Sequence, residues 1–271
     1  MNSFVVGLLC FASAGAAVRL VPCDDLAKEL DEEMNRTSIA MEPESGLASI
    51  YDRATQAAER CPDSEGLAYL RLRAAELGRG APVGRQAPSA NDEWRKLAPL
   101  LAAKFPQSAR IATVQARASG TAADARKALA LNPKYLPARV ALAAALLSSL
   151  PTEALTYLTP ERDLATVSDG YTVLARTRWA LGDSAGAIEA AKQALHARAF
   201  RLIEPDARDP RPLSAAHDVM GQALLAKKRF AEAATHLKLA APDSAVARAI
   251  LADPPPGLRK ALAAHEKHAH P

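Results

Sequence analysis

The sequence predicts an all-α protein, and three observations lead to this prediction. Hydrophobic residues make up 49% of the 271 residues and aromatic residues 4%, and alanine is the dominant apolar residue. Apolar runs such as Val140–Leu147 contain a single β-branched residue and no aromatic one. Proline and glycine interrupt the chain at intervals that suit pairs of helices. Because alanine has the highest helix propensity and strands prefer Val, Ile, Tyr and Phe, closely packed helices are expected.

Fourteen helices are expected between these breaks, and several begin at a residue that can cap a helix N-terminus. The cap candidates are Asp63 or Ser64, Asn91, Asp183 or Ser184, and Asp243 or Ser244. The expected helices span residues 22–36, 45–60, 64–78, 90–104, 107–118, 121–131, 136–149, 151–158, 170–181, 184–197, 213–227, 229–241, 243–252 and 256–267. Irregular stretches are expected at Gly78–Ala90, Thr159–Ser168 and Ala199–Leu213.

Residues 1–17 have the pattern of a secretory signal peptide. They carry no charged side chain, and a short apolar segment at residues 4–12 is followed by small residues that suit cleavage after Ala14 or Ala17. The apolar segment is too short for a permanent membrane anchor. No Lys or Arg follows Met1, so the alternative is an ordinary hydrophobic first helix. The pattern predicts an exported protein, either periplasmic or secreted.

Removal of such a signal would leave two cysteines, Cys23 and Cys61. An even number of cysteines in an exported chain favours a disulfide. Cys23 opens one expected helix and Cys61 closes the next, and these two ends lie side by side in an antiparallel hairpin. We therefore predict a structural Cys23–Cys61 disulfide; the alternative is two unlinked, partly buried thiols. Lipid attachment at Cys10 is disfavoured because the bulky Leu9 precedes it.

Charge is distributed unevenly along the chain, whose net charge is +4. Residues 18–65 carry 12 Asp/Glu and 5 Lys/Arg, whereas residues 66–271 carry 18 and 29. The basic residues are scattered among acidic ones with no run of five, which is typical of a solvated helical surface. Nucleic acid is therefore not the expected partner, although polyanion binding by the basic body stays as an alternative.

The clearest internal repeat is the hairpin Tyr171–Leu195. Its first helix contains Ala175, Gly182 forms the turn, and Ala187 and Ala194 lie on the second helix. Small residues at these positions let two helices approach closely, and glycine ends a helix without a Cβ clash. In this pattern the hairpin resembles a tetratricopeptide repeat.

Three further segments resemble the same family. His217–Ala240 has Gly221 at the small position of the first helix and Phe230 at the start of the second. Pro137–Leu158 is a weaker match, and Ala109–Pro133 is a shortened, degenerate one. The departures are Lys228 in place of the turn glycine, a missing proline after Leu195, and an insertion of about twelve residues before the last unit. These departures argue against a regular superhelix but not against a stack of hairpins.

The resemblance implies a tetratricopeptide-like α-solenoid, a right-handed superhelical stack of antiparallel helix hairpins. The expected organisation is a signal peptide at 1–17, N-terminal hairpins of degenerate repeats at 18–104, tetratricopeptide-like repeats at 105–252, and a C-terminal helix with a flexible tail at 253–271. In this family partners lie in a groove lined by the first helix of each hairpin. Arg139, Arg176 and Arg178 are the residues of this chain that we expect to contact a partner there.

The sequence contains no phosphate-binding loop, no nucleophile elbow and no metalloprotease or zinc motif. We therefore expect no catalytic residues, no cofactor and no metal. The leading hypothesis is a non-catalytic exported scaffold that binds a protein or peptide, within cell-envelope assembly or export. The alternatives are a helical, toroid-like carbohydrate-handling enzyme or enzyme-associated domain, which requires a deep pocket with at least two perturbed carboxylates, and polyanion binding.

Overall fold

The computed structural model describes residues 21–37, 43–77, 90–167, 169–199 and 212–268. Within these residues every regular element is a helix and there is no strand, which confirms the all-α prediction. The predicted signal peptide at 1–17 lies outside the described residues, as do the side chain of Asn91 and most of the stretches Gly78–Ala90 and Ala199–Leu213.

The helices begin and end within a few residues of the expected positions. The first seven are α1 (Cys23–Thr37), α2 (Pro43–Arg60), α3 (Glu65–Leu77), α4 (Ala90–Lys104), α5 (Ala109–Ser119), α6 (Ala122–Leu131) and α7 (Leu136–Leu146). The others are α8 (Pro151–Tyr157), α9 (Gly170–Ala180), α10 (Ser184–Ala199), α11 (Pro212–Ala226), α12 (Phe230–Ala240), α13 (Ala245–Ala252) and α14 (Pro256–His268). The stretch that we expected to be irregular, Thr159–Ser168, contains the 3₁₀ helix η2 (Glu161–Thr166), which is held in place by the buried Leu164.

Several helix starts are explained by their first residues. Ser64, Asp183 and Ser244, which the sequence marks as caps, each accept a hydrogen bond from the amide three residues later, at 3.4, 2.8 and 3.0 Å. Ser108 and Thr121 cap α5 and α6 in the same way, at 3.2 and 3.3 Å. Each such bond satisfies an amide that the helix itself leaves without an acceptor.

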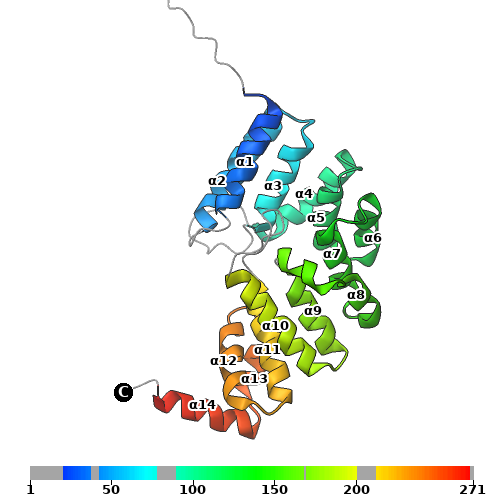
Figure 1. Cartoon of the computed structure of the whole chain (residues 1–271). Coiled ribbons are helices and arrows are strands. Elements are labelled where there is room, and N and C mark those ends of the chain that lie inside the picture. Colours follow the sequence, from blue (N-terminus) through cyan, green and yellow to red (C-terminus); the bar gives the residue numbers. More distant parts are fainter. Residues whose placement is uncertain (1–20, 38–42, 78–89, 168, 200–211, 269–271) are drawn as a thin grey trace, which may run out of the picture.

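The helices pack in chain order. From α1 to α13 each helix contacts the next, and each odd-numbered helix also contacts the following odd-numbered one. The odd-numbered helices therefore form one continuous layer, and α14 packs on α12. Figure 1 shows the result: α1 and α14 lie at opposite ends of an elongated molecule, with the remaining helices arranged between them.

Two hydrophobic cores stabilise this stack, and they meet at α5. The first extends from Leu30 to Val114 and includes the fully buried Trp94. The second extends from Ala116 to Leu258 and consists mainly of alanine, leucine and valine. Because α5 contributes to both cores, it connects the two halves of the molecule.

Small residues allow the closest helix approaches. Ala175 on α9 and Ala187 on α10 are fully buried, and the two helices pack against each other. Gly221 takes the corresponding place on α11, and a Cβ atom there would lie 2.8 Å from Cγ of Leu237 on α12. A larger residue at 221 would therefore push the two helices of this hairpin apart.

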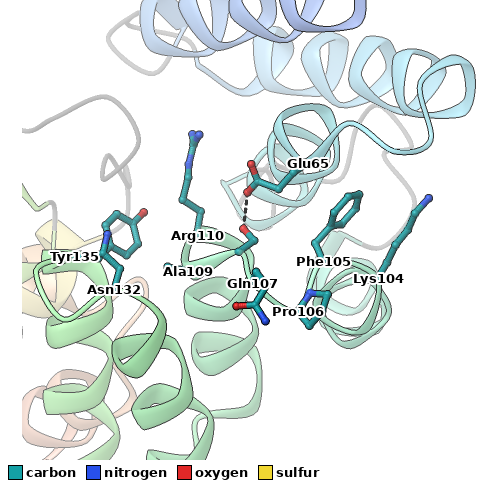
Figure 2. Close-up of a pocket in the computed structure, with 10 residues that line it drawn as sticks. Glu65, Lys104, Phe105, Pro106, Gln107, Ala109, Arg110, Asn132 and Tyr135 are labelled. Carbon is teal, nitrogen blue, oxygen red and sulfur yellow. Dashed lines mark hydrogen bonds between the residues drawn. The ribbon is translucent and has the colours of Figure 1, made fainter.

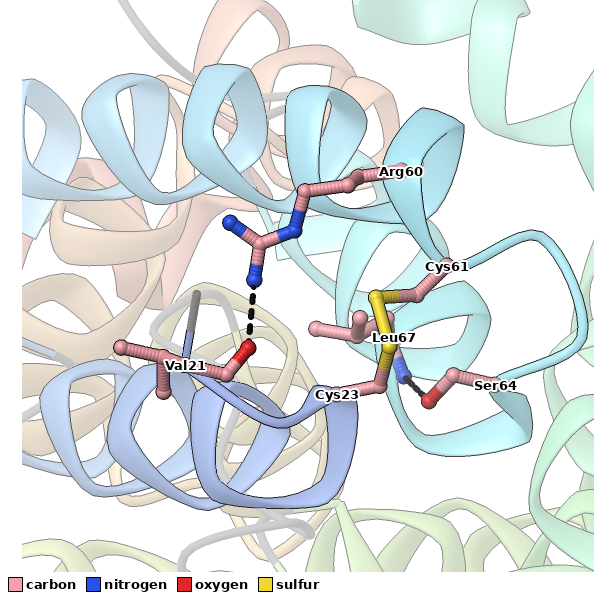
Figure 3. Close-up of a disulfide and its surroundings, with 6 residues drawn as sticks. All are labelled: Val21, Cys23, Arg60, Cys61, Ser64 and Leu67. Atoms are coloured by element: carbon pink, nitrogen blue, oxygen red, sulfur yellow. Dashed lines mark hydrogen bonds between the residues drawn. A yellow bond between two sulfur atoms is a disulfide. The ribbon is translucent and has the colours of Figure 1, made fainter. Parts of the chain in front are cut away.

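The predicted Cys23–Cys61 disulfide is present (Figure 3), and the two Cα atoms are 6.0 Å apart. It joins the start of α1 to the residue after α2, as the hairpin geometry requires. Beside it, Nη2 of Arg60 donates a hydrogen bond to the carbonyl oxygen of Val21 at 2.7 Å. These contacts hold the described N-terminal end of the chain against the end of α2, within the first hairpin.

Candidate functional site

A groove of about 490 Å³ lies at the edge of the stack, where α3, α5 and α7 begin. Its volume is within the range that ligand sites occupy in proteins. Figure 2 shows Tyr135 and Asn132 on one side of Arg110, and Phe105 and Lys104 on the other. The lining residues are Glu65, Lys104, Phe105, Pro106, Gln107, Ser108, Ala109, Arg110, Asn132 and Tyr135.

The floor of the groove is formed by the start of α5. The Ser108 hydroxyl caps this helix and also donates a hydrogen bond to Oε1 of Glu65 in the first turn of α3. One hydroxyl thus connects two helix starts, and the Glu65 carboxylate is partly satisfied within the protein (Figure 2). The first turn of α5 itself contains no acidic residue.

Arg110 is held in the groove by an aromatic ring. Its guanidinium carbon lies 3.8 Å from the ring centroid of Tyr69, whose side chain is 2% exposed. The nearest carboxylate oxygen with which it pairs, Oδ1 of Asp31, is 3.8 Å from Nη2, and the buried Nε atom has no acceptor among the described residues. Stacking on a buried ring fixes the plane of the guanidinium. The Tyr69 side chain also forms a hydrogen bond with Arg110, so the direction of the exposed part of the guanidinium is set before any ligand binds.

Lys104 supplies a second cation at the other end of the groove. Its ammonium donates to the carbonyl oxygen of Pro62, lies 5.6 Å from the Phe105 ring centroid, and is 3.8 Å from the highly exposed carboxylate of Asp63. One carbonyl acceptor uses one of the three donors of the ammonium group. Lys104 therefore also has donors available for a ligand.

The most buried charges form a cluster away from this groove. Nε and Nη2 of Arg117 on α5 donate to the two carboxylate oxygens of Glu76 on α3 at 2.7 and 3.0 Å, and Arg73 also pairs with Glu76. Burial raises the pKa of Asp169 at the start of α9, although Arg117 partly offsets this effect. Glu76 is 1% exposed, so the bidentate pair fixes α3 against α5. Ion pairs of this kind are structural.

A pair of histidines joins α11 to α12. Nδ1 of His217 and Nδ1 of His236 are 2.8 Å apart and the rings stack with centroids at 5.0 Å, so one ring donates and the other accepts. Burial lowers the pKa of both rings, and the neighbouring His236 lowers that of His217 further. Among the described residues no group of three or more His, Cys, Asp or Glu side chains is placed to hold a metal ion.

The three arginines that the sequence marked as groove contacts do not line this groove. Arg139 binds the carbonyl oxygens of Tyr157 and Thr159 at the end of α8, and Arg178 binds Glu161 and the carbonyl oxygen of Gly186. Both therefore have structural contacts. Arg176 is exposed on α9 and has no hydrogen bond or ion pair with the described part of the chain.

Sequence reasoning missed Lys104, Arg110, Asn132 and Tyr135. One signal was available. Arg110 is a cation in the first turn of a helix that has no acidic residue there, which is electrostatically unfavourable unless anions approach.

Comparison with known protein families and with curated proteins finds no match to this chain. Within the residues that the structure describes, each helix is too short or too polar to cross a lipid bilayer.

Proposed function

We propose that the chain is an exported, tetratricopeptide-like α-solenoid that holds a protein or peptide partner in the groove at the start of α3, α5 and α7. Helices that pack in chain order, with the odd-numbered ones in one layer, support the solenoid. In such a stack each hairpin is stabilised by contacts with its neighbours. The exposed residues that line a binding surface can therefore change without loss of the fold.

The groove is the single observation that carries the proposal. It is about 490 Å³ in volume and combines aromatic, amide and charged side chains from three separate segments of the chain. A site of this size and composition accommodates a few residues of an extended polypeptide, with aromatic surface for apolar groups and donors for polar ones.

Export is supported by the disulfide and by the predicted signal peptide. Disulfides persist in oxidising compartments such as the bacterial periplasm and the extracellular space, and are rare in the cytosol. The Cys23–Cys61 bond closes the first hairpin. Because α1 is the first helix of the described stack and packs mainly on α2 and α3 there, the bond adds a covalent link where non-covalent contacts are few. We place the protein in cell-envelope assembly or export.

The two alternatives, an enzyme and a polyanion-binding protein, predict different features. An enzyme needs a deep pocket with at least two perturbed carboxylates, whereas the groove contains Glu65 alone as a carboxylate. Glu76 and Asp169 do lie near each other, but Arg73 and Arg117 surround them. Polyanion binding predicts an affinity that falls steeply with salt concentration. The groove favours a partner-binding scaffold over both alternatives.

Co-purification after mild crosslinking in the native envelope fraction tests the proposal. The mature chain should recover a specific partner, and Ala109→Trp, which fills the groove, should lose it. The matched control is Lys127→Trp on α6, whose side chain is 78% exposed and does not line the groove. Recovery of no partner by the wild-type chain, or equal recovery by both variants, would contradict the proposal.

A further inference from the structure

We propose that the groove recognises an acidic side chain, Asp or Glu, inside an extended segment of the partner, with Arg110 as the residue that binds the carboxylate. This inference rests on the proposed function and specifies the chemistry of the partner.

The arrangement of Arg110 is the first argument. The guanidinium is stacked at 3.8 Å on the buried Tyr69 ring, and the Arg110 side chain as a whole is 37% exposed, so its position is fixed while part of it remains accessible. Its Nε atom is buried without an acceptor in the described residues, and the Asp31 oxygen at 3.8 Å is beyond hydrogen-bond distance. Because Nε is buried, a partner carboxylate would bind the exposed part of the guanidinium, where Asp31 provides no short hydrogen bond.

The charges around the groove are the second argument. Lys104 and Arg110 line it together with one carboxylate, that of Glu65, which already accepts a hydrogen bond from Ser108. The carboxylate beside Lys104, that of Asp63, is 96% exposed and 3.8 Å away, so water and salt screen it. The lining itself carries two cations and one carboxylate, and the Asp31 carboxylate beside Arg110 is also 3.8 Å away and 41% exposed. An anion therefore complements the lining.

The shape of the groove favours a chain that passes through over a chain end. Figure 2 shows the lining spread from Tyr135 and Asn132, across Arg110, to Phe105 and Lys104. Aromatic rings therefore lie on both sides of the arginine and can contact the residues before and after a central acidic one. In an extended segment, neighbouring side chains point to opposite sides. The residues two positions before and two positions after the acidic one therefore point to the same side as it and can contact the same wall of the groove.

The experiment uses the full mature chain and three pools of peptides about ten residues long, roughly 33 Å when extended. In the first pool a central Glu is flanked by randomised Ala, Leu, Val, Ser and Tyr, and both ends are blocked by acetyl and amide groups. The second pool has Gln in place of Glu. The third has the central Gln and a free C-terminal carboxylate. Retention on the immobilised protein is measured for each pool.

We expect the Glu pool to be retained roughly tenfold more than the Gln pool, which corresponds to one charge-assisted hydrogen-bonded contact. Arg110→Gln should reduce that ratio to about one, and Arg110→Lys should restore part of it. Arg126→Gln, which removes an arginine that pairs with Glu153 outside the groove, should leave the ratio unchanged. Thermal unfolding of each variant shows whether it is folded.

Three results would overturn the inference: equal retention of the Glu and Gln pools, preference for the pool with the free C-terminus, or a Glu preference that survives Arg110→Gln. These outcomes are separate from a failure of the proposed function. If Ala109→Trp abolishes recovery of the native partner while the Glu and Gln pools are retained equally, the groove binds a partner but does not select an acidic side chain.

Discussion

Lys228 has the left-handed backbone conformation that Gly182 has at the corresponding turn of the preceding hairpin, with φ values of 58° and 80°. The two turns also share their hydrogen bonds. In each, the amide of the following residue donates to the carbonyl five positions earlier at 2.9 Å. The two hairpins thus use the same turn, although one contains lysine where the other contains glycine.

This relationship predicts that Lys228→Gly stabilises the protein. A residue with a Cβ atom pays about 1 kcal/mol or more in the left-handed region, and glycine does not. Glycine also gives the unfolded chain more freedom, which reduces the gain. We expect an increase of about 0.5 kcal/mol in the free energy of unfolding, measured by urea denaturation.

The matched variant is Gly182→Lys, which places the same side chain in the other turn. It should decrease the free energy of unfolding by about 1 kcal/mol. If the two variants change stability in the same direction, the two turns are not equivalent.

Glu76→Ala tests the buried cluster between α3 and α5. It leaves Arg73 and Arg117 without their shared carboxylate, and removing one partner of a buried ion pair costs about 3–5 kcal/mol. Glu153→Ala removes an exposed pair with Arg126 and should cost less than about 1 kcal/mol. Urea denaturation of both variants compares the two losses, and a similar small loss for both would show that the cluster does not hold the helices together.

Stability should also depend on the redox state of the first hairpin. The disulfide joins residues 38 positions apart, and closing a loop of that length stabilises the folded chain by about 3–4 kcal/mol in the chain-entropy account. A reductant should lower the free energy of unfolding of the wild-type chain by this amount. The double variant Cys23→Ser, Cys61→Ser should start at the lower value and not respond to reductant.

Acid should destabilise the α11–α12 hairpin. Because the pKa values of His217 and His236 are lowered on folding, the unfolded chain binds protons more readily than the folded one. Stability is therefore constant above the ordinary histidine pKa of about 6.5 and falls as the pH drops below it. The nearby Glu232 opposes the shift of His236 but does not reverse it. Urea denaturation at about pH 7.5 and about pH 5.5 measures the loss.

His217→Gln is the control for this pH dependence. The variant keeps a side chain that can form a hydrogen bond to His236 but removes one titrating group and the charge repulsion between the two rings. Its loss of stability between the two pH values should be smaller than that of the wild type. An equal loss would assign the acid sensitivity to other groups.

The positions of the helices and the disulfide could be predicted from the sequence because the determinants are local. Caps such as Ser64 and Ser244 act on the next three residues, and two cysteines at adjacent ends of one hairpin have few alternatives. The stretch around Leu164 was expected to be irregular because a single 3₁₀ helix has no periodic pattern, and the burial of one leucine decides its structure.

The candidate site could not be predicted in the same way because it depends on contacts between distant segments. Arg139 was expected to contact a partner in the groove, but the end of α8 lies close enough for its carbonyl oxygens to bind the guanidinium. Conversely, Arg110 belongs to the candidate site because Tyr69, Glu65 and Tyr135, which are distant from it in the sequence, lie beside it. Whether a cation is bound by other groups of the protein depends on how the helices pack.

Site-specific photo-crosslinking in the native envelope fraction tests most directly whether the partner lies in the groove. The photoreactive residue replaces Gln107 in the groove, Arg176 on α9, or Lys192 on α10, one at a time. We expect a specific adduct from position 107 and none from position 192. An adduct from 176 or 192 with none from 107 would show that the partner binds elsewhere on the stack.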